Sequence, residues 1–202
     1  MTLLLAKNAV ITGGSDGIGL GIATEFARAG AANLVLVGRD ASKLETARKS
    51  LAAFPDTAVH LLTADLSEPK VIATLAEQIM QQLPQLDILV NNAGLGRFVP
   101  FTQMDEALFD AHFNLNVKTP YFLTQALLPA LTTAKGNVIN ISSYFAHRML
   151  PDRATTAYSA TEVREGDTNG FDHYIIQKLA FTQQNPELKQ IVRDITGVGG
   201  TT

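Results

Sequence analysis

Apolar residues form short continuous runs along the first 143 residues, and these runs alternate with segments in which apolar residues recur every three or four positions. A short continuous apolar run is typical of a strand that is covered on both faces of a parallel sheet. The pattern therefore predicts five buried strands. They are expected at residues 8–12, 34–37, 59–63, 86–90 and 138–141.

The segments between these runs predict helices. Ile18, Ile22 and Phe26 recur at helical spacing before Gly30, and Asp40 can cap a second helix. Further helices are expected from Ser67 to about residue 83, around residues 105–112, and from 116 to 132. Strands that alternate with helices predict an α/β fold. We expect a Rossmann-type, doubly wound parallel sheet in three α/β/α layers, with residues 1–202 forming a single domain.

The composition of the chain limits the kinds of molecule that the protein is expected to bind. A net charge of −3 and a pI near 5.8 argue against nucleic acid and against an anionic membrane surface. The chain has no cysteine, and its His, Asp and Glu residues show no metal-ligand spacing, so no metal is predicted. The apolar N-terminus is too short for a membrane span and lacks a signal-peptide cleavage site. A cytoplasmic protein is therefore expected.

A glycine-rich segment, TGGSDGIG at residues 12–19, lies between the first strand and the first helix. Glycine permits a tight turn and a close approach of the backbone to a pyrophosphate, and a helix N-terminus supplies N–H groups and a favourable dipole. The alternative is an ordinary turn between a strand and a helix. We expect a dinucleotide here, contacted by Gly13, Ser15, Asp16, Gly17, Ile18 and Gly19.

Five motifs in this order resemble the classical short-chain dehydrogenase/reductase family over residues 7–160. They are the glycine loop, Asp65-Leu66 after the third strand, Asn91-Asn92-Ala93-Gly94 after the fourth, Asn116 within NLNVK, and Ser143 at the end of INISS. The resemblance implies hydride transfer between a nicotinamide and a small carbonyl or alcohol substrate. It also implies that Asp65, Leu66, Asn92, Ala93 and Gly94 contact the cofactor.

The end of the second strand bears on the choice of cofactor. Enzymes that bind NAD usually place an acidic residue there for the ribose 2′-hydroxyl, whereas this chain has Gly38 followed by Arg39. Arginine can bind a 2′-phosphate through two hydrogen bonds, so NADP(H) is favoured. Asp16 argues in the other direction, because relatives that prefer NADP often have a basic residue in the glycine loop. NAD remains the alternative.

The resemblance assigns three catalytic roles: Ser143 holds the substrate oxygen, Tyr158 transfers the proton, and Asn116 supports the proton relay. The family lysine, four residues after the tyrosine, is replaced by Glu162. Free tyrosine has a pKa near 10, and a nearby carboxylate disfavours the phenolate. Tyr158 is therefore expected to be a poor general base. Tyr174 and Lys178 offer the same helical spacing as a second candidate pair.

The C-terminal region, residues 161–202, departs from the family pattern and is shorter than expected. Only 44 residues follow Tyr158, and the segment 166–170 should interrupt the expected helix. Helices are predicted at 171–182 and 186–195, with no sixth strand. The fifth strand would then be an exposed edge unless these helices or a partner subunit cover it. A degenerate natural member, a truncated or rearranged coding sequence and an engineered chain are the alternatives.

Two functions are therefore open. The first is an NADP(H)-dependent oxidoreductase, with Leu95, Arg97 and Phe98 beside the substrate. The second is a catalytically impaired relative that binds dinucleotide and acts through association. The family resemblance implies a homodimer or homotetramer in either case.

Overall fold

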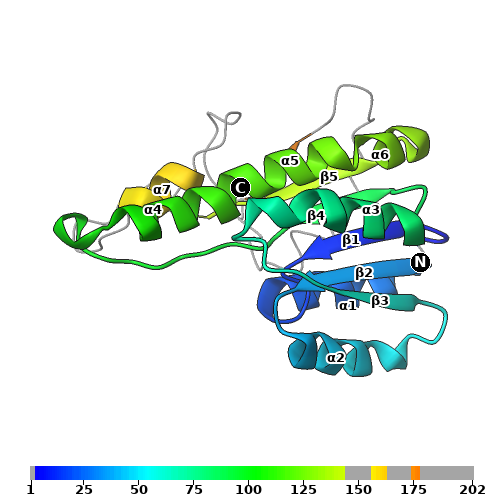
Figure 1. Cartoon of the computed structure of the whole chain (residues 1–202). Helices are drawn as coiled ribbons and strands as arrows, with labels where there is room; N and C mark the ends of the chain where they lie inside the picture. The colour runs from blue at the N-terminus through cyan, green and yellow to red at the C-terminus, as the bar shows by residue number, and fades with distance from the viewer. Residues whose placement is uncertain (1–2, 144–155, 163–173, 178–202) are drawn as a thin grey trace, which may run out of the picture.

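The structure is a computed structural model that describes residues 3–143, 156–162 and 174–177. These residues contain a six-stranded sheet in the order β3-β2-β1-β4-β5-β6, and its first five strands pair in parallel (Figure 1). The parallel sheet predicted from the apolar runs is confirmed. The strands are β1 Asn8–Thr12, β2 Asn33–Gly38, β3 Ala58–Thr63, β4 Ile88–Asn91, β5 Asn137–Ile141 and β6 Tyr174–Gln177.

Helices cover both faces of this sheet, as Figure 1 shows. The described helices are α1 Gly17–Arg28, α2 Ala41–Ser50, α3 Ile72–Gln82, α4 Glu106–Phe113, α5 Thr119–Ala126, α6 Leu128–Ala134 and α7 Thr156–Glu162. Neighbouring residues of a strand point to opposite faces. In β1, Ile11 packs with the core beneath α1 and α2, whereas Val10 packs with the core beneath α3, α5 and α6. The three-layer α/β/α architecture is therefore confirmed.

The strand order creates a switch point between β1 and β4. From β1 the chain first builds outward through β2 and β3, and it then returns to place β4 on the other side of β1. In open α/β sheets, ligands bind in the crevice that this reversal opens at the carboxyl ends of the strands. Thr12, at the end of β1, and Asn91, at the end of β4, lie at this edge.

The long helix expected from residue 116 to 132 is interrupted. The chain forms a π-helical turn at Asn114–Lys118, then α5, and then α6 after a break at Leu127. Pro120 and Pro129 lie in the first turns of α5 and α6. Proline has no N–H to donate and favours the first turn of a helix, so Pro120 coincides with the change from π-helical to α-helical bonding, and Pro129 begins α6 after the break.

The helix predicted over residues 171–182 is wrong where the structure describes that segment. Residues Tyr174–Gln177 form β6, which pairs antiparallel with β5 and places Ile139 opposite Ile176. Aromatic and β-branched residues favour strands, and β5 offered an unpaired edge. The expectation of no sixth strand is therefore also wrong, and β6, not a helix, covers the edge of β5. The helix expected at 186–195 lies outside the described residues.

Candidate active site

The glycine loop at the end of β1 is packed so closely that two of its positions exclude any side chain. A Cβ atom on Gly19 would lie 2.1 Å from the carbonyl oxygen of Gly13, and one on Gly13 would lie 2.9 Å from the Asn92 amide nitrogen. Gly13 also has a φ of 65°, in the left-handed region that favours glycine. These two glycines let the start of α1 approach the end of β1.

Hydrogen bonds join the glycine loop to the end of β4. The buried Thr12 hydroxyl donates to the Val90 carbonyl (3.2 Å) and accepts the backbone N–H groups of Asn92 and Ala93 (both 3.0 Å). The Asn92 side chain donates to the carbonyls of Thr12 (2.9 Å) and Gly13 (3.2 Å). The predicted cofactor residues Gly13, Asn92 and Ala93 therefore form one rigid rim of the crevice at the switch point.

Gly17, unlike Gly13 and Gly19, has free space around it. It has a φ of 52°, and a Cβ built on it would meet no atom within 4 Å. Gly17 is also the first residue of α1, where the amides lack partners within the helix. Asp16 caps the helix by accepting the Gly17 N–H (2.7 Å), and the neighbouring Ile18 is exposed. An open helix N-terminus of this kind suits a phosphate.

A second group of predicted residues lies beyond the ends of β2 and β3. A Cβ on Gly38 would lie 3.2 Å from the Ser15 hydroxyl, so the end of β2 closes against the glycine loop. The Asp65 carboxylate accepts hydrogen bonds from the Ser67 hydroxyl (2.7 Å) and backbone N–H (3.0 Å). These bonds, with the attraction of the exposed Arg39, hold the pKa of Asp65 below its ordinary value.

Leu66 contributes to this region through its backbone. Its side chain is buried in the core beneath α3 and α5, and its carbonyl accepts a hydrogen bond from the Thr119 hydroxyl (2.7 Å). This bond fixes the segment after β3 against the start of α5. Of the two predicted cofactor residues after β3, Asp65 thus presents an exposed side chain, whereas Leu66 holds the segment in place.

Asn116 connects the segment after β4 with α7. It is buried in the π-helical turn, where its side chain accepts the Leu95 N–H (2.8 Å) and donates to the Leu95 carbonyl (3.0 Å) and to the Thr161 hydroxyl (2.9 Å). The Thr161 hydroxyl in turn donates to the Tyr158 carbonyl (2.7 Å). The structure therefore joins two predicted catalytic residues, Asn116 and Tyr158, through Thr161, which sequence reasoning missed.

The Tyr158 ring is held in an aromatic environment. It makes an edge contact with the Phe98 ring at 5.3 Å between centroids and lies 6.4 Å from the ring of His112. A Cβ on Gly96 would lie 3.6 Å from the Tyr158 ring, an ordinary contact distance. Phe98, expected beside the substrate, therefore flanks the predicted proton donor.

His112 is a second residue that sequence reasoning missed. It is fully buried in α4; its Nε2 accepts the Arg97 N–H (3.2 Å), and its Nδ1 lies 2.8 Å from the Leu108 carbonyl. An Nε2 that accepts leaves the ring proton on Nδ1, which can then donate to that carbonyl. His112 thereby fixes the segment that carries Gly96 and Phe98. No spacing in the sequence indicates this role, because it depends on a contact between separate segments.

The end of β5 reaches the end of α7. Ser143 lies two residues after β5 and is half-buried, and the Ser142 hydroxyl donates to the Glu162 backbone carbonyl (3.0 Å). Glu162 occupies the last position of α7, four residues after Tyr158, and its relative exposure is only 5%. The residue that replaces the expected lysine therefore lies buried on the helix that carries the tyrosine.

The alternative pair is not supported in the form predicted. Tyr174 lies in β6, so the helical spacing on which the pair rested does not exist there, and Lys178 lies outside the described residues. Within the residues described, no group of three or more His, Asp or Glu side chains is arranged to hold a metal ion. Among the helices described, none is long and apolar enough to cross a membrane.

Comparison with known proteins decides the family. The profile of the short chain dehydrogenase family matches residues 7–163, more than three quarters of the chain. The chain belongs to the short chain dehydrogenase family. The match contains the glycine loop, Asn116 and α7.

Individual relatives of this short chain dehydrogenase are named as oxidoreductases or dehydrogenases. The oxidoreductase UcpA of Escherichia coli K12 is 35% identical over 80% of this chain and 60% of its own length. An L-rhamnose 1-dehydrogenase (NADP(+)) of Thermoplasma acidophilum is 33% identical over 84% of this chain and 65% of its own length. This chain thus spans less than two thirds of either relative.

A solved structure agrees with the sequence comparison. A metagenomic short-chain oxidoreductase, crystallised in complex with NADP, superposes with a TM-score of 0.71 and 38% sequence identity. The superposition covers 79% of this chain and 71% of that one. This similarity confirms the Rossmann-type fold of the family.

Proposed function

We propose that this short chain dehydrogenase is an oxidoreductase that transfers a hydride between NADP(H) and a small carbonyl or alcohol compound. The observation that carries the proposal is the glycine loop at the switch point, where Gly17 opens the N-terminus of α1 toward the crevice. Gly13, Ser15, Asp16, Ile18 and Gly19 complete this loop. The residues present fit a dinucleotide, because their backbone leaves room for a pyrophosphate that a larger residue at position 17 would fill.

The preference for NADP(H) over NAD(H) rests on the end of β2. Gly38 offers no carboxylate to a ribose 2′-hydroxyl, and Arg39 is an exposed cation at the same edge. The relative from Thermoplasma acidophilum is named for NADP(+), and the metagenomic relative was crystallised with NADP. Asp65, Leu66 and Asn92-Ala93-Gly94 would line the remainder of the cofactor site.

The catalytic residues act on the substrate oxygen. A bound nicotinamide would supply or accept the hydride. Ser143 would donate a hydrogen bond to the substrate oxygen, and the Tyr158 hydroxyl would give or take its proton. Asn116 would support the proton relay from its place between Leu95 and Thr161.

Turnover of NADPH and NADH against a panel of ketones and aldehydes tests this proposal. We expect oxidation of NADPH in preference to NADH, abolished by Tyr158→Phe, which keeps the ring contact with Phe98 and removes only the hydroxyl. Phe109→Leu, at an exposed position of α4, is the matched control and should retain activity. Turnover that survives Tyr158→Phe would contradict the assignment of Tyr158.

The buried Glu162 favours a second candidate function. A carboxylate four residues from Tyr158 disfavours the phenolate, whereas the family lysine would favour it. A protein of this kind would bind dinucleotide, turn substrate over poorly, and act through association. Glu162→Lys separates the two candidates: restored turnover supports an impaired enzyme, and turnover in the parent protein without a gain from the lysine argues against impairment.

We also infer that the protein forms a homodimer or homotetramer and acts in the cytoplasm. The support for the assembly is a set of exposed apolar side chains along α4, the π-helical turn, α5 and the start of α6, called the apolar band below. Its members are Phe109, Val117, Tyr121, Phe122 and Leu128. Large apolar side chains exposed on consecutive elements are typical of a site of protein association.

A further inference from the structure

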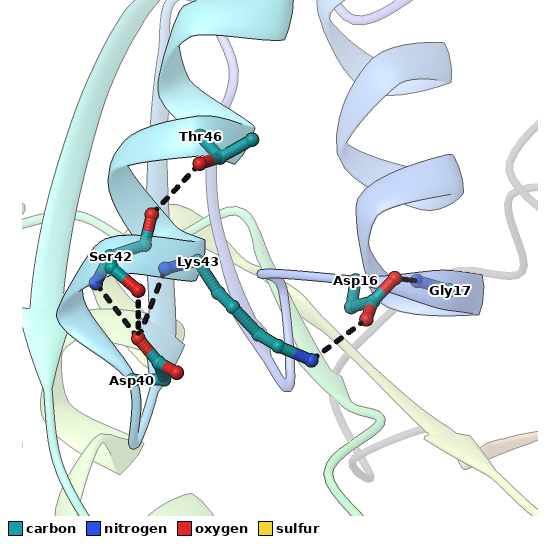
Figure 2. Close-up of polar contacts among 6 residues, drawn as sticks. All are labelled: Asp16, Gly17, Asp40, Ser42, Lys43 and Thr46. Carbon is teal, nitrogen blue, oxygen red and sulfur yellow. Dashed lines mark hydrogen bonds and ion pairs between the residues drawn. The ribbon is translucent and has the colours of Figure 1, made fainter.

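An ion pair bridges the glycine loop and the start of α2. The Lys43 ammonium lies 3.2 Å from one carboxylate oxygen of Asp16, and the other oxygen of Asp16 caps α1 at the Gly17 N–H (2.7 Å) (Figure 2). Asp40 caps α2 by accepting the N–H groups of Ser42 and Lys43. The side chain of Lys43 therefore leaves a fixed point on α2 and extends toward the start of α1, as Figure 2 shows.

This pair contributes little to the stability of the fold. The side chain of Lys43 is 58% exposed and that of Asp16 is 73% exposed, and exposed ion pairs are weak because water and salt screen them. Lys43 also lies in the first turn of α2, where the helix dipole disfavours a cation. Neither the helix dipole nor the stability of the ion pair therefore favours a lysine at this position.

The position of the ion pair between Lys43 and Asp16 suggests a function for the lysine in cofactor binding. In a dinucleotide fold the pyrophosphate lies at the start of the first helix, and the adenosine ribose lies at the end of the second strand. Asp16 belongs to the first of these places, and Lys43 lies five residues after Gly38, which ends β2. The Lys43 side chain therefore connects the helix that follows the second of these places to the first of them.

The charge on Asp16 makes a cation necessary there. The hydrogen bond from the Gly17 N–H, followed by the bond and the attraction from Lys43, holds the pKa of Asp16 below its ordinary value. Asp16 is thus anionic at neutral pH, beside the place where phosphate groups would bind. Lys43 offsets this repulsion, and a phosphate dianion can draw the ammonium away from a single, solvated carboxylate.

We propose that Lys43 is a ligand of the 2′-phosphate of NADP(H), held near its binding position by Asp16 until the cofactor arrives. This inference rests on the proposed dinucleotide function. It gives the site two cations, Arg39 and Lys43, and it explains how a glycine loop that contains an aspartate can accept a 2′-phosphate.

Binding of adenosine 2′,5′-bisphosphate and of ADP, measured by titration calorimetry at low salt, tests the proposal without catalysis. For Lys43→Met we expect affinity for the 2′,5′-bisphosphate to fall about tenfold, the loss of one charge-assisted hydrogen bond, and affinity for ADP to change by less than about twofold. Asp16→Asn, which keeps a capping oxygen, should bind the 2′,5′-bisphosphate more tightly. Added salt should reduce the difference between the two ligands.

Lys49→Met is the matched control, because Lys49 is an exposed lysine in the last turn of the same helix. It should leave both affinities unchanged. A Lys43→Met protein that binds both ligands as the parent does, or that loses both equally, overturns the role of Lys43. A parent protein that binds neither ligand instead refutes the proposed function, so the two failures are distinguishable.

Discussion

Gly17 and Gly19 lie two residues apart in the same loop, yet the structure requires glycine at each for a different reason. At Gly19 a Cβ would lie 2.1 Å from the Gly13 carbonyl oxygen, whereas at Gly17 only the positive φ is unfavourable. We expect Gly17→Ala to lower the free energy of unfolding by about 1–2 kcal/mol and to weaken dinucleotide binding, because its methyl group would take up part of the space proposed for the pyrophosphate. Gly19→Ala should cost about 3 kcal/mol and abolish binding, because the loop must move.

Urea denaturation and a binding titration measure both effects. Equal losses of stability in the two variants would contradict the distinction between steric overlap and backbone strain.

Single residues also mark the limit of prediction from the sequence. The glycine loop could be predicted because a turn, its glycines and its helix cap are neighbours in the chain. The roles of Lys43 and His112 could not, because each depends on a partner in another segment, Asp16 for one and Arg97 for the other. Thr161 was missed for the same reason, since its link to Asn116 spans 45 residues.

Between elements, the Thr12 hydroxyl makes three of the hydrogen bonds that join β1 to β4 at the switch point. Thr12→Val would leave the N–H groups of Asn92 and Ala93 without this acceptor inside the protein. We expect a loss of about 2–4 kcal/mol in the free energy of unfolding, together with weaker dinucleotide binding. Thr12→Ser keeps the hydroxyl and should lose about 1 kcal/mol for the missing methyl group. Chemical denaturation of the two variants measures the difference, and equal stability would refute this role.

The elements themselves were predictable to the degree that local sequence determines them. The five parallel strands lie within two residues of their expected bounds, because burial on both faces leaves continuous apolar runs. β6 was mistaken for a helix because Tyr174–Gln177 is too short for its periodicity to distinguish a strand from a helix. The free edge of β5, which only the assembled sheet reveals, decides its structure.

The pH dependence of stability belongs to the whole molecule. Asp16, Asp40, Glu45 and Asp65 all have pKa values held below their ordinary range by hydrogen bonds, chiefly from Gly17, Ser42, Arg48 and Ser67 in turn. A carboxyl group with a lowered pKa in the folded state binds protons less readily than in the unfolded state. Its contribution to stability is therefore present above the unfolded pKa of about 4 and is lost as the pH falls through the folded value.

We accordingly expect these groups to lower the free energy of unfolding below about pH 4 and to leave it unchanged between pH 5 and 7. The decrease should be shallow, because the carboxylates are largely exposed. Urea denaturation across this range measures it. Asp65→Asn should reduce the slope below pH 4, and an unchanged slope would show that Asp65 is not among the groups responsible.

The proposed assembly gives the last prediction. Tyr121 is 65% exposed, and its ring lies 5.2 Å from that of the exposed Phe122 on the outer side of α5. The next residue, Leu123, is fully buried and is the one that packs in the core, so charges at 121 and 122 should not disturb the packing of α5. We expect the double substitution Tyr121→Glu and Phe122→Glu to convert the homo-oligomer into a monomer, because like charges would face each other across a symmetric interface.

Sedimentation velocity measures this change, and Gln78→Glu, which also adds a charge at an exposed helical position but on α3, serves as the control. The control should remain oligomeric, because its position lies outside the apolar band. A parent protein that sediments as a monomer at all concentrations would contradict the proposed assembly. If the double variant remains oligomeric, the interface lies elsewhere on the protein and not at this band. Dinucleotide binding should survive in the monomer, since no residue of the band contributes to the glycine loop.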